Sequence, residues 1–278
     1  MCKTWLAWAL AAGIALGGEA QAHDIHINDD NCGYSTDYDV LVMPDGIDFQ
    51  SAAGRPKHVF MHDGQLRVDG RDVTVSADDA TRLRAYEMQV RVVLPEVAGI
   101  AREGVNIGFA AMRTVLLTFA ENNDERQDMV GRLDQNHRLA LARIDEGLGK
   151  GVWKQHDMAD VIEGSIQSSV SDLVGQVTGA AVKAALSGDQ SKVAALEARA
   201  NSLDATIDKE VNARAAQLDQ HAAALCPRLT ALDQLQQQMQ FRLQDGSRIT
   251  LLTYNNRNNK KLVTATDHAH TAAGDTVH

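Results

Sequence analysis

The hydrophobic pattern of this chain changes its period near Ser76, and that change constrains the fold more than any other feature. Before Ser76, apolar and polar residues alternate over short runs, which is the period of a strand buried on one face. After Ser76, apolar residues recur every three or four positions over long stretches, as in amphipathic helices. The pattern therefore predicts an α+β fold that is predominantly α, with a small N-terminal antiparallel sheet followed by long helices.

Turn sequences separate the short runs of the N-terminal region. Asp-Gly pairs occur at residues 45–46, 63–64 and 69–70. Because Asp-Gly favours the two-residue turns of β-hairpins, we expect strands at residues 40–43, 47–49, 58–62, 65–68 and 73–75. A sheet of this size cannot bury enough apolar surface to be stable alone, so we expect it to pack against the helices.

Helical stretches follow the sheet region. Ser76 and Asp79 have the spacing of a capping box, so we expect the first helix from Ser76 to about Ala120, with a kink at Pro95. Further helices are expected at residues 124–146, 157–186 and 190–244. In the last of these, apolar residues at intervals of three, four and seven are typical of a coiled coil, interrupted at Pro227. Such narrow seams bury one another, which predicts an elongated antiparallel bundle.

Residues 1–22 have the features of a cleavable secretory signal peptide. Lys3 provides a basic start, an apolar run extends from residue 5 to residue 16, and Ala20 and Ala22 supply small residues at positions −3 and −1. We expect cleavage after Ala22 and a mature protein that begins at His23 in the periplasm. The alternative is a membrane anchor, but the apolar run is shorter than the roughly 20 residues of a spanning helix.

These patterns divide the chain into four parts. The signal peptide at 1–22 precedes a small β region at 23–75, and the helical bundle occupies 76–246. The last part, 247–278, contains an expected strand at 248–254 and a polar tail that we expect to be disordered.

The charge of the chain argues against nucleic acid as a partner. The sequence has 27 Lys and Arg against 37 Asp and Glu, a formal net charge of −10, and removing residues 1–22 takes away one charge of each sign. An acidic protein without a basic stripe has nothing to neutralise phosphates with. Anionic membrane surfaces are disfavoured for the same reason, and we expect no transmembrane anchor in the mature chain.

Two cysteines, Cys32 and Cys226, follow the expected cleavage site. In an oxidising compartment an isolated pair is interpreted most simply as one disulfide, which would tie the N-terminal segment to a late helix. Two free thiols and an intermolecular bridge are the alternatives. The sequence contains no Cys-x-x-Cys motif, which argues against a thioredoxin-like redox role.

Several short motifs follow one another in an order that is similar to that of a known family. They are Cys32, Asp69-Gly70 before Ser76-Ala77, Tyr86, Leu94-Pro95, Glu103-Gly104 and Cys226-Pro227-Arg228. With the export signal, this order resembles the YggN-like family of exported bacterial proteins of unknown function over roughly residues 32–232. The resemblance implies a periplasmic location, strands before helices, a cysteine pair at these positions and no catalytic residue. The segment around Trp153 and the histidine-bearing tail depart from the family pattern.

Histidines provide the sharpest candidates for a chemical site. Cleavage after Ala22 would give His23 a free amine beside its imidazole, with His26 three residues on, and this combination suits copper or nickel. His58 and His62 share one face of an expected strand. The alternative is that all four are solvated polar residues and that the protein holds no cofactor.

Catalytic motifs are missing from the sequence. It contains no Gly-x-Ser-x-Gly elbow, Walker loop, His-Glu-x-x-His or calcium loop. No carboxylate stands in an apolar setting that would raise its pKa for acid catalysis. We therefore expect no catalytic residue and no enzyme, with an unrecognised hydrolase as the alternative.

The glycine-bearing stretch 157–186 is the candidate surface for a partner. Gly164, Gly175 and Gly179 interrupt its apolar pattern and permit close backbone packing. Long helices with apolar seams can accept another helix, so we expect non-enzymatic binding, scaffolding or chaperone-like work with a periplasmic protein. Homo-oligomers could form through the same seams, and an ordinary core helix is the alternative.

Overall fold

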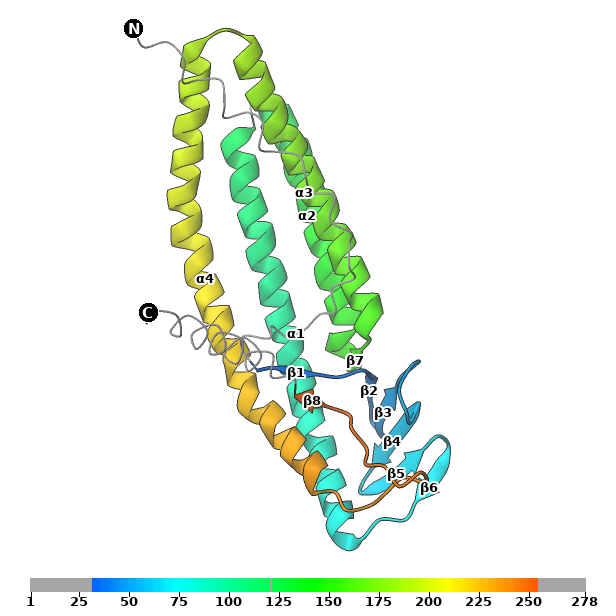
Figure 1. Cartoon of the computed structure of the whole chain (residues 1–278). Helices are drawn as coiled ribbons and strands as arrows, with labels where there is room; N and C mark the ends of the chain where they lie inside the picture. The colour runs from blue at the N-terminus through cyan, green and yellow to red at the C-terminus, as the bar shows by residue number, and fades with distance from the viewer. Residues whose placement is uncertain (1–31, 121, 255–278) are drawn as a thin grey trace, which may run out of the picture.

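The computed structural model describes residues 32–120 and 122–254 of the chain (Figure 1). Its helices are α1 (Ala77–Phe119), α2 (Asn123–Glu146), the 3₁₀ helix η1 (Leu148–Lys150), α3 (Gln155–Leu186) and α4 (Gln190–Gln238). Its strands are β1 (Tyr34–Ser35), β2 (Asp39–Met43), β3 (Gly46–Gln50), β4 (His58–His62), β5 (Gln65–Val68), β6 (Arg71–Val73), β7 (Val152–Trp153) and β8 (Thr253–Tyr254). The predicted α+β fold, predominantly α with a small antiparallel sheet near the N-terminus, is confirmed.

Two predicted segments cannot be compared with the fold. The signal peptide at residues 1–22 and the polar tail after Tyr254 lie outside the described residues. Among the helices within 32–120 and 122–254, none combines the length and the apolar character that crossing a bilayer requires.

The main sheet of the described chain is antiparallel, with the strand order β6-β5-β4-β3-β2-β7. The hairpins β4–β5 and β5–β6 both turn through an Asp-Gly pair, as predicted. Asp63 and Gly64 have φ of 44° and 80°, and Asp69 and Gly70 have φ of 46° and 78°. Two successive positive φ values are typical of the type I′ turn, whose twist matches that of paired strands.

One face of this sheet packs against the first part of α1 and the last part of α4. Along β4 and β5, Val59, Met61 and Leu66 alternate with more exposed residues, and each is at most 2% exposed. The helical residues of the same core come from α1 and α4 and are Leu83, Tyr86, Val90, Val93, Leu229 and Leu232. The sheet is therefore stabilised by the helices, as its size predicted.

A second core lies between the other half of α1 and its helical neighbours. Helix α1 runs through Pro95 without ending and supplies Val105, Phe109 and Leu116 to this core. Helix α2 and η1 supply Met129, Leu133, Ala140, Ile144 and Leu148. Helix α3 contributes Leu173 alone to the cluster among the residues whose side chains the structure describes. Much of the apolar surface of α3 thus remains outside the core.

The end of the last helix differs from the prediction. We expected this helix to continue to Gln244, which was wrong, because α4 ends at Gln238. The expected strand at 248–254 is reduced to β8, which pairs with β1. Residues 239–252 run along the core without regular structure, and their buried side chains are Met239, Phe241, Ile249 and Leu251.

Two polar side chains explain why the helix stops. The carboxylate of Asp79, in the first turn of α1, accepts hydrogen bonds from the backbone N–H groups of Gln240 (3.0 Å) and Phe241 (3.1 Å). A continuing helix would use these N–H groups for its own bonds. The side chain of Gln236 accepts from the N–H of Leu251 (2.6 Å) and Leu252 (3.0 Å). Long-range hydrogen bonds therefore outweigh the local helical pattern.

The segment around Trp153 forms a strand that we did not predict. Val152 and Trp153 make up β7, which pairs with β2 at the edge of the main sheet. Gly151 precedes it with φ of 81°, and its carbonyl accepts a hydrogen bond from the N–H of Val42 at 2.7 Å. A strand of two residues is too short to show an alternating pattern in the sequence.

Gly64→Ala is expected to lower the free energy of unfolding by roughly 2 kcal/mol more than Gly70→Ala does. The two glycines have φ of 80° and 78°, so an added Cβ strains both backbones by a similar amount. At Gly64 that Cβ would also lie 2.7 Å from the carbonyl oxygen of Ala80 in α1, whereas nothing lies within 4 Å at Gly70. Urea unfolding of the two variants measures the difference. Equal losses would contradict the close approach of this turn to α1.

Candidate functional site

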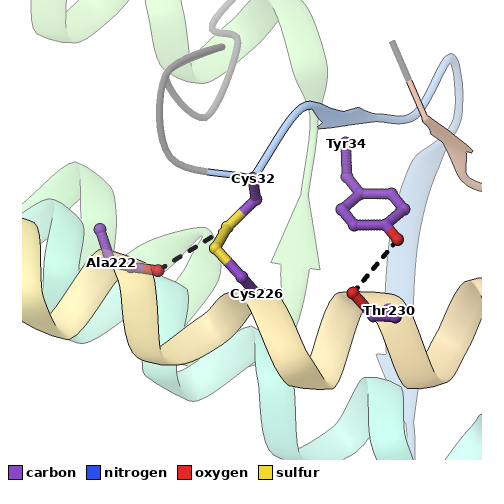
Figure 2. The surroundings of a disulfide bond; sticks show 5 residues. All are labelled: Cys32, Tyr34, Ala222, Cys226 and Thr230. Carbon is purple, nitrogen blue, oxygen red and sulfur yellow. Dashed lines mark hydrogen bonds between the residues drawn. A yellow bond between two sulfur atoms is a disulfide. The ribbon is translucent and has the colours of Figure 1, made fainter. Parts of the chain in front are cut away.

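The predicted disulfide between Cys32 and Cys226 is present and ties the N-terminal segment to α4 (Figure 2). The two Cα atoms lie 5.2 Å apart although the residues are 194 positions apart in the sequence. Beside the bond, the hydroxyl of Tyr34 donates a hydrogen bond to Oγ1 of Thr230 on α4 at 3.2 Å (Figure 2). The ring of Tyr34 also lies 5.0 Å from that of Tyr254 in β8. Covalent and non-covalent contacts therefore hold β1 against α4.

The histidines proposed as metal ligands do not converge where the structure describes them. His58 and His62 occupy the two ends of β4, so their backbones are roughly 13 Å apart. His58 contacts Asp48, and Nδ1 of His62 lies 3.7 Å from Oε1 of Glu87. Two histidines so far apart cannot both bind one ion at about 2 Å.

The other candidate metal ligands, His23 and His26, lie outside the described residues. Within 32–120 and 122–254, no group of three or more His, Cys, Asp or Glu side chains is arranged to hold a metal ion. The amine–imidazole site at a cleaved N-terminus, with copper or nickel, stays a prediction.

One histidine that the sequence did not single out lies in a small hollow between α1 and α2. His137 stacks on Phe109 with ring centroids 4.9 Å apart, and its Nε2 lies 2.8 Å from Oδ1 of Asn106. Burial lowers the pKa of His137 below its ordinary value, which favours the neutral imidazole. The hollow measures about 290 Å³, and none of its lining residues is a serine, threonine or cysteine. The carboxylate that lines the hollow, Asp134, is paired with Arg113 at 2.6 Å.

An exposed apolar ridge on α3 is the most distinctive surface of the described chain. We define the α3 ridge as Ile166, Val170, Val174, Val182 and Leu186. Its members are spaced by four or eight residues, which places them along one inclined row of the helix surface. Val174 is 58% exposed and Leu186 is 83% exposed. Exposed apolar residues that are grouped in this way mark interaction sites more often than scattered ones do.

The buried side of α3 explains part of this exposure. Leu173, Ala180 and Ala184 are buried on the side that faces the other helices. At about 100° per residue, this side lies opposite Val182 and Leu186 and next to Ile166. Alanine side chains fill little space, so this side packs closely without using the larger residues. Between residues 164 and 186, the only charged residues are Asp172 and Lys183. The ridge is therefore surrounded by small, uncharged side chains rather than by a charged surface.

Basic residues gather near the end of the ridge, where α3 turns into α4. Lys183, Lys192 and Arg199 line a hollow of about 330 Å³ together with apolar and small side chains. Val193, in the first turn of α4, is 48% exposed and adds to the apolar surface there. This end of the molecule thus combines exposed apolar groups with positive charge, although the chain as a whole is acidic.

The stretch that we expected to bind a partner from the sequence overlaps this surface only in part. Our candidate stretch, 157–186, covers the ridge, whereas Val193 and the cations Lys192 and Arg199 lie beyond it. The spacing of Ile166, Val170 and Val174 by four was visible in the sequence. That spacing occurs on buried and exposed rows alike, so it did not show which row faces solvent.

The family described as Protein of unknown function (DUF2884) matches residues 32–252, which include every strand and helix described above except β8. No curated protein matches the chain, and no solved structure matches it.

Proposed function

Since this chain belongs to the DUF2884 family of proteins of unknown function, we propose a function from its surface: a non-enzymatic binding protein with scaffolding or chaperone-like work. In this proposal, the α3 ridge takes an amphipathic helix of a partner protein. The observation that supports it most is the exposure of Val174 (58%) and Leu186 (83%) on a stretch, 164–186, whose only charged residues are Asp172 and Lys183. Burying such side chains against a partner would be favourable by about 1.5 to 3 kcal/mol each.

The shape of the ridge favours a helical partner. Rows of side chains spaced by four residues are the ridges that fit between the corresponding rows of a second helix, with the axes crossing at about −50°. Gly175 and Gly179 lie between ridge residues and carry no side chain that would keep a second backbone away. An Ala-, Ser- or Gly-rich surface of this kind suits helix-on-helix contact better than an extended peptide.

The charges near the ridge specify the partner further. Lys183, Lys192 and Arg199 lie next to the exposed Leu186 and Val193 at the α3–α4 turn. A helix that places leucines on the ridge and acidic residues beside these cations would be complementary in both respects. The proposed occupant is therefore an acidic amphipathic helix.

The proposal also includes export, as for YggN-like proteins, to the bacterial periplasm after cleavage of the signal peptide behind Ala22. The Cys32–Cys226 disulfide supports an oxidising compartment, because such bonds are rare where thiols are kept reduced. An elongated antiparallel bundle with coiled-coil-like packing of α4 belongs to the same proposal. The lengths of α1 (43 residues) and α4 (49 residues) support that arrangement.

Replacing Val174 and Leu186 by asparagine is expected to weaken binding of an acidic amphipathic helix at least tenfold. The probe is a fluorescent 18-residue peptide of leucine, alanine and glutamate, and its affinity is measured by anisotropy with the oxidised protein. Both side chains are exposed, so the fold is expected to tolerate the change. A peptide of the same composition in scrambled order, without an apolar face, is expected to bind at least tenfold more weakly.

Met88→Asn and Leu139→Asn are the matched control variants. These residues are 61% and 50% exposed on α1 and α2 and do not belong to the ridge, and the change in size and polarity is comparable. The controls are expected to bind the peptide like the unmodified protein. Equal weakening by the controls, or equal binding of the scrambled peptide, would overturn the proposal. A concentration-dependent dimer by light scattering that only the ridge variant abolishes would replace the partner helix with a second copy of this chain.

A further inference from the structure

We propose that a second site, at the sheet end of the molecule, binds a small amphiphilic carboxylate: one carboxylate group on an apolar chain. The site is a groove of about 720 Å³, a volume typical of small-molecule sites. Its walls come from three segments that are distant in the sequence, residues 55–57, 68–73 and 242–245. Figure 1 shows strands β5 and β6 and the chain after α4 together at the end opposite to the α3–α4 turn. The groove is therefore separate from the α3 ridge.

Four cations line the groove beside three carboxylates. The cations are Arg55, Lys57, Arg71 and Arg242. The guanidinium of Arg71 donates a hydrogen bond to the uncharged side chain of Gln244 at 2.7 Å. The side chains of Lys57 and Arg242 hold no hydrogen bond or ion pair with any residue that the structure describes. Two positive charges at the groove thus have capacity for an anion.

The carboxylates that line the groove already have other partners. Asp69 accepts hydrogen bonds from the backbone N–H groups of Lys57 and His58, at 3.0 Å each. Asp72 accepts from Arg67 at 3.0 Å, and Asp245 accepts from the hydroxyl and the N–H of Ser247 at 2.6 and 2.9 Å. Hydrogen bonds from Ser247, and to a smaller extent the charge of Arg55, lower the pKa of Asp245, so this carboxylate is ionised and bound within the protein. Lys57 and Arg242 are left as the groups that an incoming carboxylate would meet.

The apolar part of the groove accounts for the chain of the ligand. Pro56 is buried, and Val68, Val73 and Leu243 are half-buried along the lining. The walls are fixed before any ligand binds. The hydroxyl of Tyr38 donates to the carbonyl of Pro56 at 2.9 Å, and the N–H of Leu243 donates to the carbonyl of Ser247 at 3.0 Å. A preformed apolar surface beside two available cations matches an amphiphile with a single negative group.

Decanoate is the probe for this site, and its affinity for the full oxidised chain is measured by titration calorimetry at low ionic strength. We expect decanoate to bind at least tenfold more tightly than decanol, which lacks the charge, and than acetate, which lacks the chain. The double variant Lys57→Gln, Arg242→Gln is expected to weaken decanoate binding about tenfold, because both charge-assisted contacts are lost. Added salt is expected to weaken it in the unmodified protein.

Two control variants separate this site from general charge and from the α3 ridge. Arg138→Gln removes one exposed cation from α2, and Leu186→Gln removes the most exposed ridge residue. Both are expected to bind decanoate like the unmodified protein. Absence of decanoate binding, equal affinity for decanol or acetate, or an equal loss in Arg138→Gln would overturn the proposal. A loss in Leu186→Gln alone would assign the decanoate to the ridge and would also overturn it.

Discussion

Replacement of both Cys32 and Cys226 by serine lowers the free energy of unfolding by about 5 kcal/mol in the limit where the bond acts only on the unfolded chain. The bond closes a loop between residues 194 positions apart, and so long a loop loses much of its conformational freedom when it is closed. Denaturant unfolding of the oxidised protein and of the double variant measures this loss. For a domain with a total stability of about 5 to 15 kcal/mol, the variant would lose a large share of it.

The unmodified protein under a reducing agent serves as the control for this prediction. It is expected to lose the same free energy of unfolding as the double variant, since both lack the crosslink and differ only at two sulfur atoms. A loss below about 1 kcal/mol in both samples would contradict the prediction. In that case the contacts of Tyr34 with Thr230 and Tyr254 would suffice to hold β1 on α4.

Asp79→Asn is expected to lower the free energy of unfolding by about 3 kcal/mol. The carboxylate of Asp79 is 1% exposed and accepts hydrogen bonds from the N–H groups of Gln240 and Phe241 and from Arg82 (2.9 Å). An asparagine has one accepting oxygen and would direct its NH₂ group at a donor, so at least one buried donor loses its partner. Asp78→Asn, exposed in the same helical turn, is the matched control and is expected to change stability little.

The acid sensitivity of the protein gives a second readout of the same residue. Burial would raise the pKa of Asp79, but the hydrogen bonds from Gln240, Arg82 and Phe241 outweigh it and hold the pKa below its ordinary value of 3.8. A lowered folded-state pKa means that the contribution to stability is complete above pH 3.8 and is lost as the pH falls through the folded-state pKa. Asp79→Asn is therefore expected to flatten the fall in stability below that pH. If the stability of the variant falls below pH 3.8 as steeply as that of the unmodified protein, the lowered pKa of Asp79 is contradicted.

The parts of the fold that the sequence predicted are those set by local chemistry. Asp-Gly favours positive φ, and the pairs at 63–64 and 69–70 form the two expected hairpin turns, whereas Asp45 does not adopt positive φ and the last strand begins at Arg71 instead of Val73. The cap at Ser76 is present, because its side chain accepts a hydrogen bond from the N–H of Asp79 at 3.1 Å. The parts that were wrong depend on distant partners. No residue near Gln238 in the sequence indicates that a carboxylate of α1 accepts hydrogen bonds from the backbone N–H groups of residues 240 and 241.

The candidate site shows the same division. A period of four identified α3 as a helix with an apolar row, but the exposure of that row depends on which side of α3 packs against the other helices. No sequence pattern indicated the groove at the sheet end, because its cations at 55, 57 and 242 come from segments that lie together only in the folded chain. His58 and His62 lie on one strand, as predicted. They occupy its two ends, and the prediction that they share a face of the strand did not consider how far apart they are.

The contacts of β1 with α4 and β8 join segments that are synthesised at different times. At about 5 to 20 residues per second, Cys226 is synthesised roughly 10 to 40 s after Cys32, and β8 later still. During that interval Cys32 has no native partner, and the first strand has no neighbour to pair with. The bond can therefore form only on a chain that has been synthesised past the middle of α4. A molecule with this disulfide is thus one in which synthesis has reached at least Cys226.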